Sequence, residues 1–217
     1  MGRHDLRDRS VRVALTVTLL IVLTAAAGAA PPTIFFDDFN RPDGSLDRRN
    51  WSDVTATISG QRVCGDAQSI ALYGQTITSD HVRVSYEFSA ADPSGFESYV
   101  ILQAGSATYD AGCDGGFGDG GLCTPKVARG MDNLTTATAI PMVTGTVYRM
   151  QAEIDHGVVT VTIADAQGTA LGHVAADTSE HFTEFGLTVG RRADGQLTCA
   201  DNFRIEDLSS DAGTDER

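Results

Sequence analysis

Apolar and polar side chains alternate along much of this chain with the period of two that is typical of β-strands. Residues 81–88 put two valines, a tyrosine and a phenylalanine on one face and polar side chains on the other. Residues 148–155 alternate in the same way, and a turn then leads into a returning apolar segment at 158–163. Residues 81–88 predict a half-buried strand, and residues 148–155 with 158–163 predict a β-hairpin.

The same kind of pattern continues through the rest of the chain, and helix signals are almost absent. Residues 99–102 are apolar on both faces, which indicates a central strand. Residues 105–121 contain many glycines, and we expect them to form a long loop. Short strands separated by turns predict an all-β fold, an antiparallel β-sandwich of the jelly-roll type. Further strands are expected at 171–175, 185–189 and 203–205.

Two similar aromatic and acidic segments lie near the two ends of the region of β pattern. The first is FFDDFN at residues 35–40, and the second is CADNFRI at residues 199–205. We expect these two strands to lie side by side and close the sandwich. In the second strand, alternation predicts that Asp201 and Phe203 point to the same face.

The first 30 residues have the composition of a secretory signal peptide. Four arginines precede an uncharged apolar segment, which ends in AGAA at 27–30. The alternative is an uncleaved N-terminal anchor, because about 18 apolar residues can just span a bilayer. We expect a secreted protein with one domain at 31–208 and a disordered acidic tail at 209–217.

The charge of the chain excludes several kinds of partner. The whole chain carries a formal net charge of −13, and the signal segment removes four Arg and two Asp. A strongly acidic protein repels nucleic acid and anionic lipid, since both need cationic contacts. We therefore expect neither nucleic acid nor, after signal cleavage, a membrane as a partner, and we expect a monomer.

All four cysteines lie in the exported part of the chain. An even number of cysteines in an oxidising compartment indicates two disulfides, for which three pairings exist. We favour Cys113–Cys123, which closes a short loop, and Cys64–Cys199, which joins an early strand to the last one.

Several segments together resemble a known fold family. Residues 36–46 read FDDFNRPDGSL, residues 185–190 read FGLTVG, and residues 201–205 read DNFRI. With the hairpin at 147–163, they resemble secreted bacterial domains with the concanavalin A-like, laminin G-like jelly roll. The resemblance covers most of residues 34–208. It implies the fold, which hosts lectins, glycan-binding modules, glucanases and adhesion domains.

The glycine-rich segment provides the predicted ligand-binding residues. Exposed aromatic rings stack on sugars at low entropic cost, and polar groups orient them. We expect Tyr109 and Phe117 to be exposed in this loop, beside Asp114 and Asp119.

The resemblance also implies a structural calcium ion between the first and last strands. Asp38 and Asp201 are the carboxylates placed to bind it, with backbone carbonyls completing the shell. The alternative is that each Asp caps backbone N–H groups or pairs with an arginine at a strand end.

The catalytic motifs of this fold are missing from the sequence. Glucanases of this fold carry three acids at alternate positions of one strand, and the nearest match, Glu153 and Asp155, lacks the third acid. No nucleophile elbow is present. We therefore expect a non-catalytic domain that binds extracellular or cell-wall carbohydrate. The alternatives are a protein-interaction or adhesion domain of laminin G type and, least favoured, a glycoside hydrolase.

Overall fold

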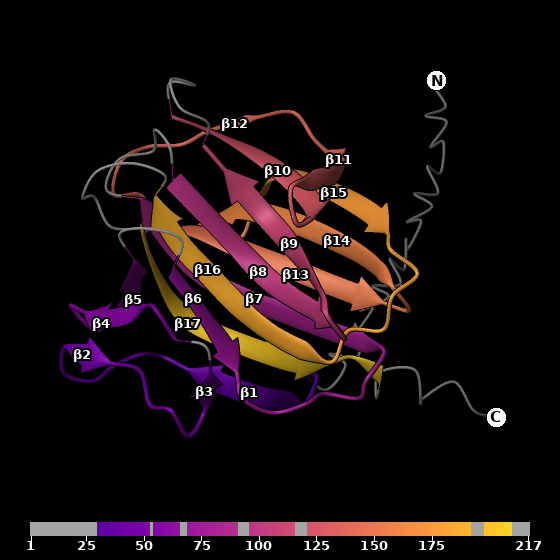
Figure 1. Cartoon of the computed structure of the whole chain (residues 1–217). Helices are drawn as coiled ribbons and strands as arrows, with labels where there is room; N and C mark the ends of the chain where they lie inside the picture. The colour runs from indigo at the N-terminus through magenta and orange to yellow at the C-terminus, as the bar shows by residue number, and fades with distance from the viewer. Residues whose placement is uncertain are drawn as a thin grey trace, which may run out of the picture.

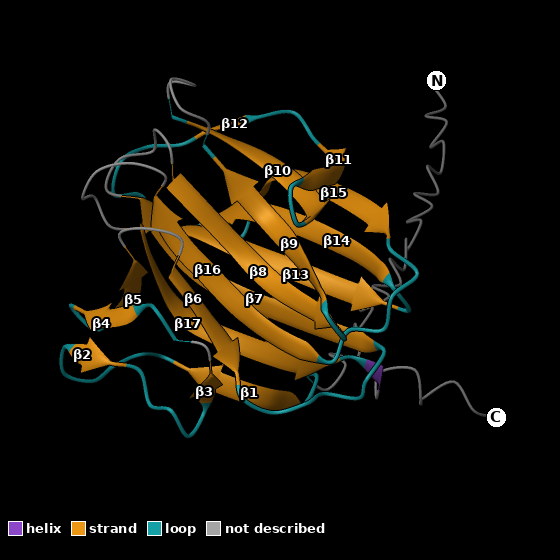
Figure 2. Cartoon of the chain, viewed as in Figure 1, coloured by secondary structure: helices purple, strands orange, loops and turns teal. Residues whose placement is uncertain are grey.

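The chain forms an antiparallel β-sandwich, as Figures 1 and 2 show. The structure is a computed structural model that describes residues 30–209 except 53, 66–68, 91–95, 116–120 and 192–197. Within these residues, the strands form one sheet of nine and one of eight, which lie one over the other (Figure 1). The predicted all-β fold class is therefore confirmed.

The nine-stranded sheet has the order β15-β14-β13-β7-β17-β5-β4-β2, with β1 also paired to β17. Its strands are β1 (Thr33–Asp37), β2 (Gly44–Ser45), β4 (Thr57–Ser59), β5 (Arg62–Gly65), β7 (His81–Ala90), β13 (Tyr148–Asp155), β14 (Val158–Asp165), β15 (Ala170–Asp177) and β17 (Thr198–Asp207).

The eight-stranded sheet has the order β11-β10-β9-β8-β16-β6-β3, with β12 also paired to β10. Its strands are β3 (Trp51–Ser52), β6 (Ser69–Tyr73), β8 (Phe96–Ala104), β9 (Ala107–Asp114), β10 (Leu122–Arg129), β11 (Asp132–Thr136), β12 (Ile140–Pro141) and β16 (Glu184–Arg191).

The alternation of the sequence decides which face of each strand enters the core. Strands β7 and β13 pair so that Val84 lies opposite Ala152, and Tyr86 opposite Met150. All four side chains are at most 2% exposed, because they face the second sheet. The predicted hairpin is β13–β14, in register from Tyr148 onward. The core therefore lies between the inner faces of the two sheets.

The two ends of the domain lie side by side, as predicted, because β1 pairs with β17. The predicted orientation of Asp201, however, is wrong. A β-bulge between Asp201 and Arg204 shifts the register against β7, and Asn202 takes a left-handed backbone with φ of 54°. The bulge adds one residue, so Ala200 and Phe203 are buried while Asp201 is only partly buried.

The buried carboxylate at this end is Asp37, which is 8% exposed. Arg41 donates two hydrogen bonds of 2.8 Å to it, and the Trp51 indole donates a third of 2.8 Å. The backbone N–H of Phe39 donates a fourth. Burial alone would raise the pKa of Asp37, but these hydrogen bonds outweigh burial and lower the pKa. Asp37 therefore stays ionised and joins β1 to the core around Trp51.

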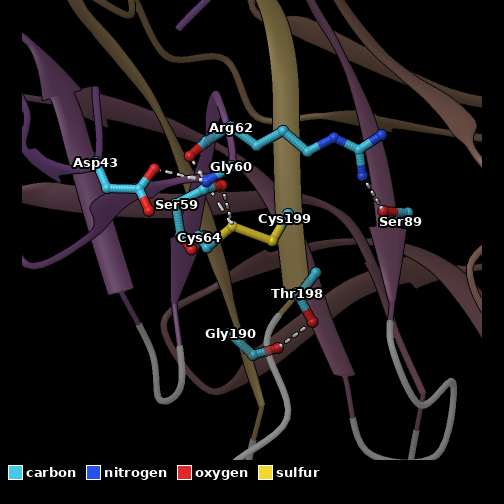
Figure 3. The surroundings of a disulfide bond; sticks show 9 residues. All are labelled: Asp43, Ser59, Gly60, Arg62, Cys64, Ser89, Gly190, Thr198 and Cys199. Carbon is cyan, nitrogen blue, oxygen red and sulfur yellow. Dashed lines mark hydrogen bonds between the residues drawn. A yellow bond between two sulfur atoms is a disulfide. The ribbon is translucent and has the colours of Figure 1, made fainter. Parts of the chain in front are cut away.

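Both favoured disulfides are present. Cys64 and Cys199 are direct partners on β5 and β17, with their Cα atoms 4.2 Å apart (Figure 3). Cys113 and Cys123 join the neighbouring strands β9 and β10. The first bond spans 135 residues and the second spans 10. The first bond therefore constrains the unfolded chain more strongly.

The expectation of a long loop at 105–121 is wrong for residues 107–114, which form strand β9. Only a short turn around Gly105 separates β8 from β9, which runs to Asp114. The glycines at 116, 118 and 120 lie outside the described residues. Pairing with β8 and β10 on both sides gives β9 its backbone hydrogen bonds, so the nearby glycines do not prevent a strand.

The two ends of the sequence lie mostly outside the described residues. Residues 1–29 and 210–217 belong there, so the signal peptide and the acidic tail stay predictions. Among residues whose placement is described, no helix is long and apolar enough to cross a membrane.

Candidate functional site

A pocket on the outer face of the eight-stranded sheet collects polar side chains from three neighbouring strands. The inner-face residues of β8, β9 and β10 pack in the core, so the alternate residues point outward. Register places Glu97 of β8 directly opposite Asp114 of β9. It also places Tyr99 of β8 and Lys126 of β10 on either side of Gly112. Asp110 lies on the same face, two residues before Gly112.

The volume of this pocket is about 450 Å³, and we call it the acidic pocket. The turn after β10 and strand β11 form its rim. The rim residue Met131 is fully exposed. The described lining residues are Glu97, Tyr99, Asp110, Asp114, Thr124, Lys126, Gly130, Met131, Asn133 and Thr136.

The charged groups of the acidic pocket are largely buried. Glu97 is 1% exposed, and Lys126 and Asp114 form an ion pair of 2.9 Å in which both side chains are less than one-fifth exposed. The Lys126 ammonium also lies over the Tyr99 ring, 5.2 Å from its centre. Three carboxylates and one ammonium are therefore among the described lining residues.

Two pKa values in the pocket are raised. Burial raises the pKa of Asp110 to about 6, against the attraction of Lys126 and with help from Glu97 and Asp114. Burial also raises the pKa of Tyr99, and the negative charge of Asp114 adds to this effect. At neutral pH, Tyr99 is therefore a neutral hydroxyl donor, while Asp110 is ionised and becomes protonated below pH 6.

The structure distributes the predicted ligand-binding residues differently from expectation. Asp114 lines the pocket, but at the end of a strand. Tyr109 was expected to be exposed and is only 2% exposed, because its position in β9 faces the core. Its ring packs edge-on against Phe182, and its hydroxyl donates to Glu180 at 3.0 Å. Phe117 and Asp119 lie outside the described residues.

Sequence reasoning missed most of the pocket, namely Glu97, Tyr99, Asp110 and Lys126. One signal was present. In residues 108–114, Thr, Asp, Gly and Asp alternate with Tyr, Ala and Cys, which is a strand pattern. The glycine content of the surrounding segment concealed this pattern.

A second groove lies on the outer face of the nine-stranded sheet, around Phe36 and Arg204. Its volume is about 420 Å³. The Phe36 side chain is 45% exposed, and the Arg204 guanidinium lies 4.9 Å from its ring centre. Arg149 and Glu87 form an ion pair of 3.4 Å beside them. Arg149 and Arg204 in this groove thus each have an acidic neighbour.

The acids nearest to a glucanase motif make ordinary surface ion pairs. Glu153 accepts a hydrogen bond of 2.9 Å from Arg83 and lies 3.4 Å from His81. Burial alone would raise the pKa of Glu153, but these two partners lower it. Asp155 pairs with His156 at the exposed hairpin turn. These contacts fit the interpretation of a solvated sheet face.

The predicted calcium ligands both accept hydrogen bonds from nearby backbone N–H groups. Asp38 accepts one of 3.1 Å from Asn40, and Asp201 accepts one of 2.8 Å from Asn202. Burial raises the pKa of Asp201, and Asp38 is among the nearby charges that add to this. The part of the chain that the structure describes contains no group of three or more His, Cys, Asp or Glu side chains arranged to hold a metal ion.

Solved structures share this architecture. A xylan β-1,4-xylosidase from Bacillus halodurans C-125 superposes with a TM-score of 0.58 and 13% identity, over 79% of this chain and 38% of that one. Lectin II from Ulex europaeus superposes with a TM-score of 0.53 and 14% identity, over 79% of this chain and 97% of the lectin. The VIP36 exoplasmic/lumenal domain, bound to Ca²⁺ and Man3GlcNAc, superposes with a TM-score of 0.53 and 10% identity, over 78% of this chain and 90% of that domain.

The fold is the concanavalin A-like β-sandwich. The resemblance inferred from the terminal segments is therefore confirmed at the level of fold. No protein-family model matches the chain, and no curated protein matches it in sequence. The concanavalin A-like neighbours include both lectins and glycoside hydrolases, and at such low identity they establish the fold alone.

Proposed function

We propose that this protein is a secreted, non-catalytic domain that binds extracellular carbohydrate in the acidic pocket. The observation that carries the proposal is a pocket of about 450 Å³ whose lining is mostly polar side chains held by paired strands. This volume lies in the range of small-molecule sites. Two disulfides and lectins of the same fold support an extracellular, carbohydrate-binding role.

The chemistry of the lining suits a polyhydroxylated ligand. Carboxylates such as Glu97 and Asp114 accept hydrogen bonds from sugar hydroxyls, while Lys126 and Tyr99 donate them. Strands hold these groups, so little conformational entropy is lost when a ligand binds. The exposed Met131 adds an apolar contact for a ring face.

Binding is favoured over catalysis by the position of the acid with the raised pKa. Asp110 would be the natural general acid, yet it lies four residues from Asp114 along β9, or about 13 Å. Two carboxyl groups that act on one glycosidic bond lie about 5–9.5 Å apart. The backbone positions of Asp110 and Asp114 are therefore farther apart than the two carboxyl groups of such a pair.

Hydrolysis remains a second candidate because of one specific pair. Directly opposite residues on antiparallel strands have Cβ atoms about 4.5–5.5 Å apart, so Glu97 and Asp114 approach the spacing of a retaining glycosidase. Release of reducing sugar from a polysaccharide panel, abolished in Glu97→Gln, would replace the binding proposal with this one.

The test of binding is a glycan array followed by titration of the best ligand. We expect specific binding by the wild type and at least a tenfold loss in Glu97→Gln. Glu153→Gln is the matched control, since it makes the same change on the outer face of the other sheet. No binding across a broad array, with an intact fold, would refute the proposal and favour a protein-interaction domain.

Calcium has no role in this proposal. Asp38 and Asp201 supply two carboxylates and calcium takes 6–8 oxygen ligands, so backbone carbonyls would have to complete the shell. Their predicted role can be tested by melting the protein with calcium and with chelator. We expect the same midpoint in both, and stabilisation by calcium that is lost in Asp201→Asn would restore the prediction.

A further inference from the structure

We infer that the groove around Phe36 and Arg204 is a second saccharide-binding surface, which takes a neutral, extended chain of β-1,4-linked sugars. The groove lies on the outer face of the nine-stranded sheet, on the opposite side of the sandwich from the acidic pocket. Either site can therefore exist without the other. Three features of the groove support this role: a row of outward side chains, an exposed ring, and charged groups that are already paired.

The first feature is a row of side chains that crosses four neighbouring strands. Phe36 of β1 lies opposite Arg204 of β17. Arg204 lies opposite Ser85 of β7, and Ser85 lies opposite Gln151 of β13. All four residues line the groove, and neighbouring strands are about 4.8 Å apart, so the row is about 14 Å long. A single sugar ring is shorter than this row, so a chain of several rings is needed to contact both ends.

The second feature is the exposed ring of Phe36 at one end of the row. Its side chain is 45% exposed, although it is a large apolar group. The Arg204 guanidinium lies 4.9 Å from the ring centre, and this contact limits the orientations that the ring can take. An aromatic ring held in this way can stack on the C–H face of a sugar with little loss of conformational entropy.

The third feature is the pairing of the charged groups beside the row. Arg149 lies 3.4 Å from Glu87, and Arg204 lies 3.8 Å from Glu206. The side-chain amide of Asn202, which lies at the β-bulge of β17, donates a hydrogen bond of 3.2 Å to Glu87. Because each arginine already has a carboxylate partner, the groove favours a neutral ligand over an anion or a cation.

The shape of the groove selects among neutral saccharides. Outward side chains of paired strands stand side by side, so the row is an extended surface. A β-1,4-linked glucan is an extended ribbon with equatorial ring substituents, so the C–H face of one ring can lie on Phe36. The hydroxyls of the following rings then lie near Ser85, Gln151 and Arg149, which can donate hydrogen bonds to them. An α-1,4-linked glucan is coiled, so it contacts less of the row.

The experiment measures the affinity for cellohexaose, the β-1,4-linked glucose hexamer, by isothermal titration, with its α-1,4-linked isomer maltohexaose as the matched ligand. We expect cellohexaose to bind at least tenfold more tightly, and we expect affinity to rise from the disaccharide to the tetrasaccharide. Because the ligand is uncharged, added salt should change the affinity by less than about twofold. Phe36→Ala should reduce the affinity about tenfold, whereas Phe36→Tyr, which keeps the ring, should retain most of it. Gln151→Ala should reduce the affinity for the tetrasaccharide about threefold, since it removes the amide at the other end of the row.

Two control variants separate this groove from its surroundings and from the acidic pocket. Ile34→Ala removes another exposed apolar side chain of β1, two residues from Phe36, and should leave the affinity unchanged. Glu97→Gln should also leave it unchanged, because Glu97 lines the acidic pocket on the other sheet. Circular dichroism shows whether each variant is folded.

Several results would overturn the inference. These are no binding of cellohexaose, equal binding of the two hexamers, or equal loss in Ile34→Ala and Phe36→Ala. A wild-type dimer that Phe36→Ala dissociates would show that the exposed ring is instead an interface between two copies of the chain. If Glu97→Gln loses cellohexaose and Phe36→Ala keeps it, the inference fails while the proposed function survives. If Phe36→Ala loses cellohexaose and Glu97→Gln keeps every glycan ligand, the inference stands and the acidic pocket is not the binding site.

Discussion

Replacing Asp37 by alanine should destabilise the protein far more than the same change at Asp38. Asp37 is 8% exposed and accepts hydrogen bonds from Arg41, the Trp51 indole and the Phe39 backbone. Asp38 is exposed and accepts one bond from the Asn40 backbone. The two adjacent residues therefore form a matched pair, in which the same atoms are removed from a buried and an exposed position.

The expected loss of stability in Asp37→Ala follows from the hydrogen-bond donors that lose their acceptor. In Asp37→Ala, the buried N–H groups of Trp51 and Phe39 lose their acceptor, at about 1–3 kcal/mol each. The Arg41 side chain is 31% exposed, so water partly replaces its partner, and we add at most about 1 kcal/mol for it. We expect a total of about 3–5 kcal/mol, which lowers Tm by about 6–20 °C in a chain of this size. Asp38→Ala should cost less than about 0.5 kcal/mol.

Thermal melting followed by circular dichroism measures both variants, and the pH dependence gives a second test. The folded pKa of Asp37 is lowered, so its ionised form contributes stability above about pH 4 and loses that contribution as pH falls further. The Tm difference between wild type and Asp37→Asn should therefore shrink below pH ~4. If Asp37→Ala melts within ~2 °C of Asp38→Ala at neutral pH, the assignment of Asp37 as a buried anchor is refuted.

The disulfides and Tyr109 yield two further predictions. Replacing Cys64 and Cys199 by serine should cost about 5 kcal/mol in the chain-entropy model, against about 3 kcal/mol for Cys113 and Cys123, since the closed loops span 135 and 10 residues. Denaturant titration checks this order, and a reversed order would show that native-state packing dominates. Tyr109→Phe should cost about 1 kcal/mol through the lost hydrogen bond and leave saccharide binding unchanged. A specific loss of binding would instead return Tyr109 to the ligand site.

Only some of the residues that line the acidic pocket could be predicted from the sequence. Asp114 was identified as a binding residue, but from an expected loop. Glu97 and Asp114 are 17 positions apart, and nothing local to either residue indicates that they are opposite each other. The raised pKa of Asp110 depends on burial and on charges from three strands, which the linear sequence does not show.

The sequence alone predicted the fold class, the strands, the hairpin and the presence of two disulfides. These features depend on local period-two alternation, on turn residues and on cysteine number, so they can be read one segment at a time. Tertiary structure decided the register and the single extra residue at the Asn202 bulge. Because of that extra residue, Asp201 lies outside the core, whereas Tyr109 in the paired strand β9 faces the core. A one-residue shift exchanges the two faces of a strand, so the site depends on pairings that alternation alone cannot set.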